Sequence, residues 1–270
     1  MNYPELKGRV ALVTGAARGI GHNIARRLAQ CGCNVWIGDV DPISGRAAID
    51  TLRQAGLAAK FVEVDLARAG NPQSIVRQVV DQAGGIDILV NNARAGKRVT
   101  LEDESEDNWE TVFGVIVKAA FFASQEALHH MTRRGHGSIV NIGSVAASLT
   151  THESPSYHAA KAALTHLTRY LAASVGAPGI RVNCVTPGLI VKDEDRSRFD
   201  SEDNSEDRLL AERVHPLRRA GRADDVADAV LYLASDSASF VNGQSIVVDG
   251  GLTVQEPFDL VTYLRPSDPR

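Results

Sequence analysis

Residues 9–21 read RVALVTGAARGIG, a short apolar run that ends in a glycine-rich turn. The run is rich in valine and predicts a buried strand over 9–14. Apolar residues then recur at helical spacing, which predicts a helix over 19–31. Glycine lets a backbone turn sharply and approach a ligand, and the start of a helix offers free N–H groups to an anion. This order favours a dinucleotide pyrophosphate site. The residues expected to form it are Gly15, Arg18, Gly19, Ile20 and Gly21.

Strands and helices alternate along the rest of the chain. Further apolar strands are expected at 34–39, 58–64, 86–90, 138–142, 180–186 and 245–248. Helices are expected at 42–55, 72–84, 108–131, 154–175 and 224–234. Nearly every strand is uniformly apolar, as in a parallel sheet that is covered on both faces. We therefore predict an α/β fold: a single doubly wound, Rossmann-type domain over residues 1–270, with a parallel seven-stranded sheet and helices on both faces.

Two segments break this alternation. Residues 192–207 read KDEDRSRFDSEDNSED, and this charged stretch is either a solvated loop or part of a substrate lid over 192–213. The extended C-terminal tail, residues 252–270, contains apolar side chains, which predict that it docks on its own subunit or on a neighbour. These side chains are Phe258, Leu260, Val261, Tyr263 and Leu264.

Composition excludes several classes of protein. The 270 residues carry a net charge of −4, which argues against a nucleic-acid-binding surface. No uninterrupted apolar stretch approaches the roughly 18 residues of a membrane span, and residues 1–8 lack an apolar signal core. Three cysteines are too few for a disulfide scaffold. We expect a cytoplasmic protein with no membrane partner, no nucleic-acid partner and no metal site.

The second predicted strand ends at Asp39, which suggests which cofactor binds. A carboxylate at this position accepts hydrogen bonds from both ribose hydroxyls and repels a 2′-phosphate, which favours NAD. Arg18 argues the other way, because an arginine in the glycine turn could bind that phosphate. The alternatives are therefore NADP, bound through Arg18, or an Asp39 that only caps the next helix.

A second set of residues suggests acid–base chemistry. Tyr157 and Lys161 are four residues apart on a predicted helix, so both side chains lie on one face. An ammonium group near a tyrosine favours the phenolate, which can take a proton from an alcohol or return one to a carbonyl. Ser144 comes just after the fifth strand, at the carboxyl edge where ligands bind in such sheets, and its hydroxyl can hold the reacting oxygen.

Together these motifs resemble the short-chain dehydrogenase/reductase family over about residues 8–251. The resemblance implies an NAD(P)-dependent enzyme that acts on CH–OH groups. In it, Tyr157 would move the proton, Ser144 would hold the oxygen, and Lys161 would hold the ribose. It also implies a homotetramer or homodimer built on the helices at 108–131 and 154–175. The further cofactor contacts that it implies are Asp65, Leu66, Asn92, Tyr157, Lys161, Pro187, Gly188 and Ile190.

Three positions depart from the family pattern: Arg94 replaces a glycine, Ile116 an asparagine and Lys192 a threonine. Ile116 cannot hold the water of the family's proton relay. Arg94 and Lys192, with Lys97 and His152, would place positive charge near the reacting centre, and an arginine fork suits a carboxylate, sulfonate or phosphate. The predicted substrate-binding residues are Arg94, Lys97, Ser144, His152, Tyr157 and Lys192.

The predicted activity is hydride transfer between NAD and a secondary alcohol or carbonyl. The expected small-molecule substrate is a sugar, a polyol or an anionic sugar derivative, that is, a sugar acid or a sulfonated sugar. Several alternatives stay open. The positive side chains could be solvated, with Arg94 paired to Glu102 or Asp103 and Lys192 on the pyrophosphate. The protein could also be an NADP-dependent ketoacyl-type reductase, or a non-catalytic NAD-binding regulatory protein.

Overall fold

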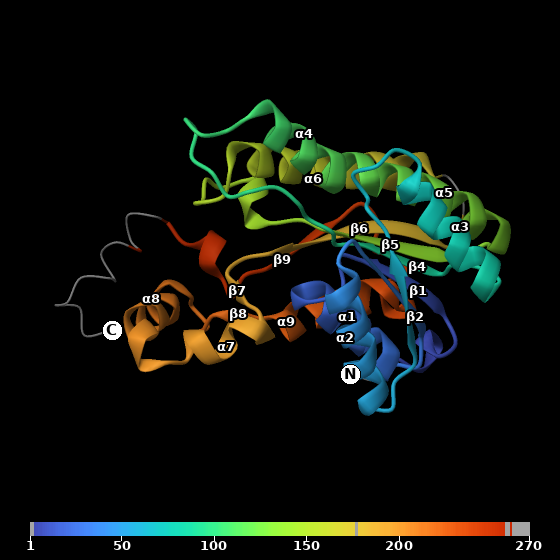
Figure 1. The fold of residues 1–270 in the computed structure, drawn as a ribbon, viewed down its shortest axis with the longest axis horizontal. Coiled ribbons are helices and arrows are strands. Elements are labelled where there is room, and N and C mark those ends of the chain that lie inside the picture. Colours follow the sequence, from blue (N-terminus) through green and yellow to red (C-terminus); the bar gives the residue numbers. More distant parts are fainter. Residues whose placement is uncertain (1–2, 176–177, 257–259, 261–270) are drawn as a thin grey trace.

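A parallel sheet forms the centre of the molecule. The computed structural model describes residues 3–175, 178–256 and 260 (Figure 1). In this part of the chain, seven strands form the sheet in the order β3-β2-β1-β4-β5-β6-β9, and every neighbouring pair is parallel. The strands are β1 (Val10–Thr14), β2 (Asn34–Asp39), β3 (Ala59–Glu63), β4 (Ile88–Asn91), β5 (Gly137–Ile142), β6 (Ile180–Pro187) and β9 (Ser245–Val248). The predicted Rossmann-type fold with a seven-stranded sheet is confirmed.

Helices cover both faces of this sheet (Figure 1). One face carries α1 (Gly19–Gln30), α2 (Pro42–Gln54) and α9 (Ala223–Ala234). The other carries α3 (Asn71–Ala83), α4 (Glu106–Phe113), α5 (Ala119–Arg134) and α6 (Pro155–Ser174). Each face of the sheet packs against its helices in a separate hydrophobic core, and successive side chains of β1 point to opposite cores. Ala11 and Val13 pack on the first face and Leu12 on the second. The order of strands reverses between β1 and β4, and ligands bind at such a switch point in α/β sheets.

The helix predicted at 108–131 is not continuous. A π-helical turn, Gly114–Lys118, separates α4 from α5, and the amide of Ala119 donates to the carbonyl of Gly114. Glycine is a poor helix former, which weakens the regular pattern at this point. Ile116 lies in the turn and is buried. The wider turn, not a regular helix, therefore sets where its side chain points.

The same helical segment can be compared with a membrane span. Among the described residues, Glu106–Arg134 is long and apolar enough to cross a membrane, judged by length and composition alone. In the structure, Ala119, Ala123, Ala127 and Met131 are buried in the core of the α3–α5 face. The segment packs as a core helix of the domain.

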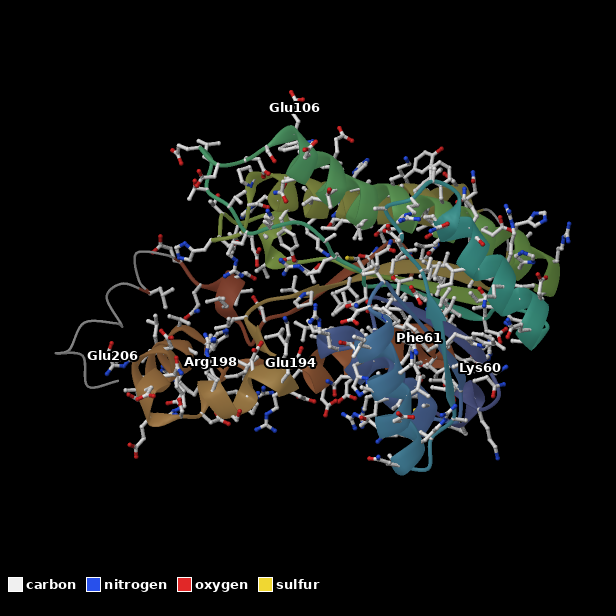
Figure 2. All side chains as sticks on the ribbon, viewed as in Figure 1. Lys60, Phe61, Glu106, Glu194, Arg198 and Glu206 are labelled. Atoms are coloured by element: carbon white, nitrogen blue, oxygen red, sulfur yellow. The ribbon has the colours of Figure 1, made fainter. Side chains whose placement is uncertain are left out.

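The charged stretch after Val191 is not a simple loop. It contains α7 (Asp193–Phe199) and α8 (Ser205–Val214), and a short parallel pair, β7 (Ile190–Val191) and β8 (Gly221–Arg222), closes its base. Glu194, Arg198 and Glu206 lie on this insertion, apart from the sheet (Figure 2). Val191, Ala211 and Ala220 form a small core beneath it.

The tail beyond β9 is described only in part. Residues Leu252–Val254 form a 3₁₀ turn after Gly251. Of the apolar residues expected to dock, Phe258, Val261, Tyr263 and Leu264 lie outside the described residues.

A buried arginine joins the sheet to α9. Arg181 lies on β6, and its guanidinium donates to the carbonyl oxygens of Leu233 at 2.6 Å and Ser235 at 3.0 Å. These carbonyls belong to the end of α9, where a helix leaves acceptors without partners. The charge of Arg181 therefore caps α9 from within the core.

We predict that Arg181→Met lowers the free energy of unfolding by about 2 kcal/mol, because it leaves buried acceptors without a charged donor. Urea denaturation measures the loss. Arg46→Met, which removes an exposed arginine of α2, is the control and should change stability by less than about 0.5 kcal/mol. Equal effects of the two substitutions would contradict the capping role.

Candidate active site

The carboxyl ends of β1 and β4 are tied to each other. The Thr14 hydroxyl donates to the carbonyl of Val90 at 3.3 Å and accepts from the amide of Asn92 at 3.1 Å. The Asn92 side-chain amide donates to the carbonyls of Thr14 at 3.0 Å and Gly15 at 2.8 Å. Asn92, an expected cofactor contact, thus holds the glycine turn in place.

The glycines of this turn are needed for a contact within the protein. A Cβ on Gly15 would lie 2.6 Å from the Cα of Ala93, and φ of Gly15 is +63°. A Cβ on Gly21 would collide with the side chain of Asn92 and with the carbonyl of Gly15. The turn therefore packs directly on the loop after β4, a reason for glycine that the sequence did not show.

The start of α1 fits the pyrophosphate of a dinucleotide. Arg18 is the N-cap, and no side chain of the described residues caps the first turn, which begins with Gly19, Ile20 and Gly21. A helix start with free N–H groups and a partial positive charge is an anion site. The side chain of Lys192 extends over Gly19, because a Cβ there would lie 3.2 Å from its Cδ. The residues present thus suit the dinucleotide that the fold family implies.

Asp39 lies beside the same turn. Its carboxylate accepts from the amides of Ala17 at 3.0 Å and Asp41 at 3.1 Å. A carboxylate offers about four acceptor positions, so about two are left for a ligand. The alternative role as the cap of the next helix is wrong, because Asp41 caps α2 by accepting from Ile43 and Ser44.

Arg18 is exposed and lies close enough to Asp41 to affect that carboxyl group. Hydrogen bonds from Ser44, together with the charge of Arg18, lower the pKa of Asp41.

The other expected cofactor residues line the same edge of the sheet. Asp65 follows β3, and its carboxylate accepts from Ala67 at 3.0 Å and from Arg68 at 3.1 Å, while Leu66 is buried. β6 ends at Pro187 and is followed by Gly188, where a Cβ would lie 2.6 Å from the Cβ of Asp249. Ile190 begins β7 at the base of the insertion.

The acid–base residues meet at the end of β5. Tyr157 and Lys161 are both buried on α6. The Lys161 ammonium donates to the carbonyl of Ile142 at 2.6 Å and lies 5.5 Å from the centre of the Tyr157 ring. Ser144 accepts from the amide of Ala146 at 3.2 Å, and Ala146 packs in the same cluster as Tyr157. The structure therefore brings the three side chains to one place.

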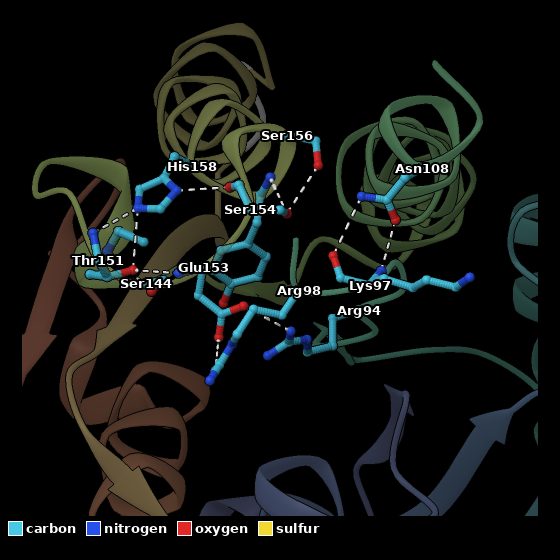
Figure 3. A network of polar contacts seen from close by, with 12 residues as sticks. Arg94, Lys97, Arg98, Asn108, Ser144, Thr151, Glu153, Ser154, Ser156 and His158 are labelled. Carbon is cyan, nitrogen blue, oxygen red and sulfur yellow. Dashed lines mark hydrogen bonds and ion pairs between the residues drawn. The ribbon is translucent and has the colours of Figure 1, made fainter. Parts of the chain in front are cut away.

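The first turn of α6 is held by residues that the sequence did not single out. The amide of Ser156 donates to a Glu104 carboxylate oxygen at 2.9 Å, and Ser154 caps the helix by accepting from Tyr157. His158 donates from Nδ1 to the carbonyl of Ser154 at 2.8 Å and accepts at Nε2 from Thr151 at 2.9 Å (Figure 3). These contacts fix the turn that carries Tyr157, and the one from Ser156 to Glu104 joins residues 52 positions apart in the sequence.

The four positively charged residues that were expected around the substrate do not lie together in the structure. Arg94 lies by the site, with its Cζ 4.9 Å from the centre of the Tyr157 ring, and it pairs with Glu153 and not with Glu102 or Asp103. Lys97 holds Asn108 through its backbone, and its side chain extends away from Glu153 (Figure 3). His152 is exposed. Lys192 lies over the glycine turn, as noted above. Of the four positive residues expected at the substrate, only Arg94 contacts Tyr157.

Glu153 is the carboxylate that binds these arginines. It accepts from Arg98 at 2.5 Å and from Arg94 at 3.3 Å. Burial alone would raise the pKa of Glu153, but the hydrogen bond from Arg98 and the charges of Arg94 and Arg98 outweigh it and lower that pKa. Glu153 is therefore held in its ionised form.

Ile116 lies in an apolar environment beside the site. It packs with Val112, Ala120, Tyr157 and Leu164 in one buried cluster. An isoleucine side chain has no polar atom, so it holds no water at the place that the family gives to an asparagine.

Comparison with known proteins identifies the family. Residues 15–253 match the family model described as enoyl-(acyl carrier protein) reductase. The chain is 36% identical over 250 residues to 3-oxoacyl-[acyl-carrier-protein] reductase of Chlamydia pneumoniae, covering 92% of this chain and 98% of the relative. The chain belongs to the short-chain dehydrogenase/reductase family.

Other members of the family act on sugars and sugar acids by name. The present chain is 35% identical over 251 residues to a probable galactose dehydrogenase of Rhizobium meliloti, and the match covers 93% of this chain and 97% of the relative. It also resembles the solved structure of a gluconate 5-dehydrogenase from Burkholderia cenocepacia in complex with NADP and tartrate. The identity is 35% and the TM-score 0.82, over 93% of this chain and 97% of that one. As a short-chain dehydrogenase/reductase, the chain is an NAD(P)-binding oxidoreductase that acts on an alcohol or carbonyl group.

Proposed function

We propose that this short-chain dehydrogenase/reductase uses NAD to oxidise a secondary hydroxyl of a sugar, a polyol or an anionic sugar derivative. The observation that carries the proposal is the buried Tyr157–Lys161 pair, with its ammonium 5.5 Å from the ring centre, at the end of β5 beside Ser144. The relatives named for galactose and gluconate support a polyhydroxylated substrate. The relatives are reductases and dehydrogenases, which argues against a non-catalytic NAD-binding protein.

Side chains of this protein would accept the proton of the substrate hydroxyl and form a hydrogen bond to its oxygen. The nicotinamide, when bound, supplies the hydride acceptor. Tyr157 takes the proton from the reacting hydroxyl, and Ser144 donates a hydrogen bond to the same oxygen. The ammonium of Lys161 lies beside the Tyr157 ring, so it attracts negative charge on this side chain while the proton moves. Burial of Tyr157 and Lys161 keeps water from weakening this attraction.

We predict that Tyr157→Phe lowers turnover at least about a hundredfold and leaves NAD binding within about twofold, because only the oxygen that carries the proton is lost. Turnover is followed by the absorbance of the reduced cofactor, and binding by calorimetry. Tyr170→Phe, at an exposed position of the same helix, is the matched control. A Tyr157→Phe enzyme with near-wild-type turnover would show that another group moves the proton.

The preference for NAD rests on Asp39. Two backbone amides hold its carboxylate beside the glycine turn, so it cannot swing away from a 2′-phosphate without losing both hydrogen bonds. A phosphate close to a fixed carboxylate is repelled, whereas ribose hydroxyls can donate to it. Two features favour NADP instead: the exposed Arg18 in the glycine turn, and the similar gluconate 5-dehydrogenase structure, which contains NADP.

We predict that Asp39→Ala raises the ratio of kcat/KM with NADP to kcat/KM with NAD at least tenfold, which is about 1.4 kcal/mol. Steady-state kinetics with both cofactors measure the ratio. Asp50→Ala on α2 removes the same charge without touching the turn, and should leave the ratio unchanged. A wild-type enzyme that prefers NADP tenfold would mean that Arg18 outweighs Asp39.

A second candidate is an NADP-dependent ketoacyl-type reductase. The match to the 3-oxoacyl reductase of Chlamydia pneumoniae and the position of Arg18 favour it. Reduction of a ketoacyl thioester with NADPH, faster than oxidation of any polyol or sugar acid with NAD, would establish this candidate instead.

The active form is proposed to be a homotetramer or homodimer that packs through α5 and α6. A groove between these helices is lined by Leu128, Leu171 and Val175, together with polar side chains such as His129 and Arg133. Apolar surface of this kind favours association. Light scattering at micromolar concentration should give two or four times the mass of the chain, and a monomer would refute the assembly.

A further inference from the structure

Two arginines and one glutamate form a bridge across the mouth of the site. Arg94 and Arg98 belong to the loop after β4, and Glu153 belongs to the loop before α6. The two oxygens of Glu153 accept one bond each, from Arg98 at 2.5 Å and from Arg94 at 3.3 Å (Figure 3). One carboxylate thus holds two guanidinium groups side by side.

This bridge lies against the group that is expected to move the proton. The Cζ of Arg94 is 4.9 Å from the centre of the Tyr157 ring, and Arg98 is close enough for its charge to interact with Tyr157. A ligand group bound by the arginines would therefore lie only a few bonds from a hydroxyl held at Tyr157.

The charges of the bridge do not balance. Glu153 neutralises one of the two guanidiniums, and among the described residues no other carboxylate pairs with either Arg94 or Arg98. The side chain of Glu153 is 15% exposed, whereas those of Arg94 and Arg98 are 48% and 64% exposed. A guanidinium has five N–H donors, and each arginine gives one to Glu153, so most donors remain open to a ligand. Two adjacent like charges with one counter-ion favour the binding of a second anion.

We propose that Arg94 and Arg98, held in place by Glu153, bind a carboxylate of the substrate, so that the substrate is a polyhydroxylated acid. The proposal rests on the proposed function and narrows its substrate class. A guanidinium matches a carboxylate through two parallel hydrogen bonds, which a neutral polyol cannot offer. Arg98 and Glu153 are then specificity-determining residues, with Glu153 acting through the two arginines.

Binding without turnover provides the test. Gluconate and its neutral counterpart glucitol are titrated by calorimetry into the Tyr157→Phe protein saturated with NAD. We expect gluconate to bind at least about tenfold more tightly, because hydrogen bonds to charged groups are strong. In the same background, Arg98→Met should remove most of this difference and leave the affinity for glucitol unchanged, and Arg94→Met should also lower the affinity for gluconate.

Lys97→Met is the charge-matched comparison. It removes one positive charge from the same loop, but the Lys97 side chain extends away from Glu153, so gluconate affinity should change less than about twofold. Equal affinity for gluconate and glucitol, or a loss in Lys97→Met as large as that in Arg98→Met, would each overturn the carboxylate site. A wild-type enzyme that binds gluconate through the arginines but oxidises no polyol or sugar acid with NAD would instead defeat the proposed function.

Discussion

The close packing of the glycine turn on the loop after β4 is the contact on which the rest of the site depends. A Cβ on Gly15 would lie 2.6 Å from the Cα of Ala93, so the two backbones are in direct contact. This contact sets the start of α1, and with it the anion site, at the edge where β4 ends. Asp39 is joined to the same turn through Ala17, and Arg94 follows Ala93 directly. The contact between Gly15 and Ala93 thus helps to position both Asp39, on the cofactor side, and Arg94, on the substrate side.

The acid–base residues are placed by a second set of contacts around α6. Glu104 accepts from Ser156, Glu153 bridges Arg94 and Arg98, and each of these bonds joins the loop after β4 to the beginning of α6. Lys161 reaches β5 through the carbonyl of Ile142. The start of α6 is therefore anchored by the loop after β4, and the next turn is anchored by β5. These two anchors explain how the buried Tyr157 keeps a fixed position at the carboxyl edge of the sheet.

The sequence predicted the features that depend on local pattern. Uniformly apolar strands and helical spacing identify the sheet, and the ends of β2 and β9 agree with the prediction to the residue. Long-range contacts could not be found in this way. The partner of Arg94 is Glu153, 59 residues away, and nothing local distinguishes it from Glu102. The charged segment folds into α7 and α8 because Ala211 packs on Val191 and Ala220, and a side-chain pattern with this little apolar content predicts a loop.

We propose that this edge of the sheet holds NAD between Asp39 and Tyr157, and a crystal structure of the NAD complex would test this placement. We predict that the hydroxyls of the adenosine ribose donate to the free acceptor positions of Asp39. The pyrophosphate should lie at the start of α1, under Lys192, and the nicotinamide beside Tyr157 and Lys161. A complex in which the adenosine ribose does not contact Asp39, or in which the nicotinamide lies away from Tyr157, would contradict it.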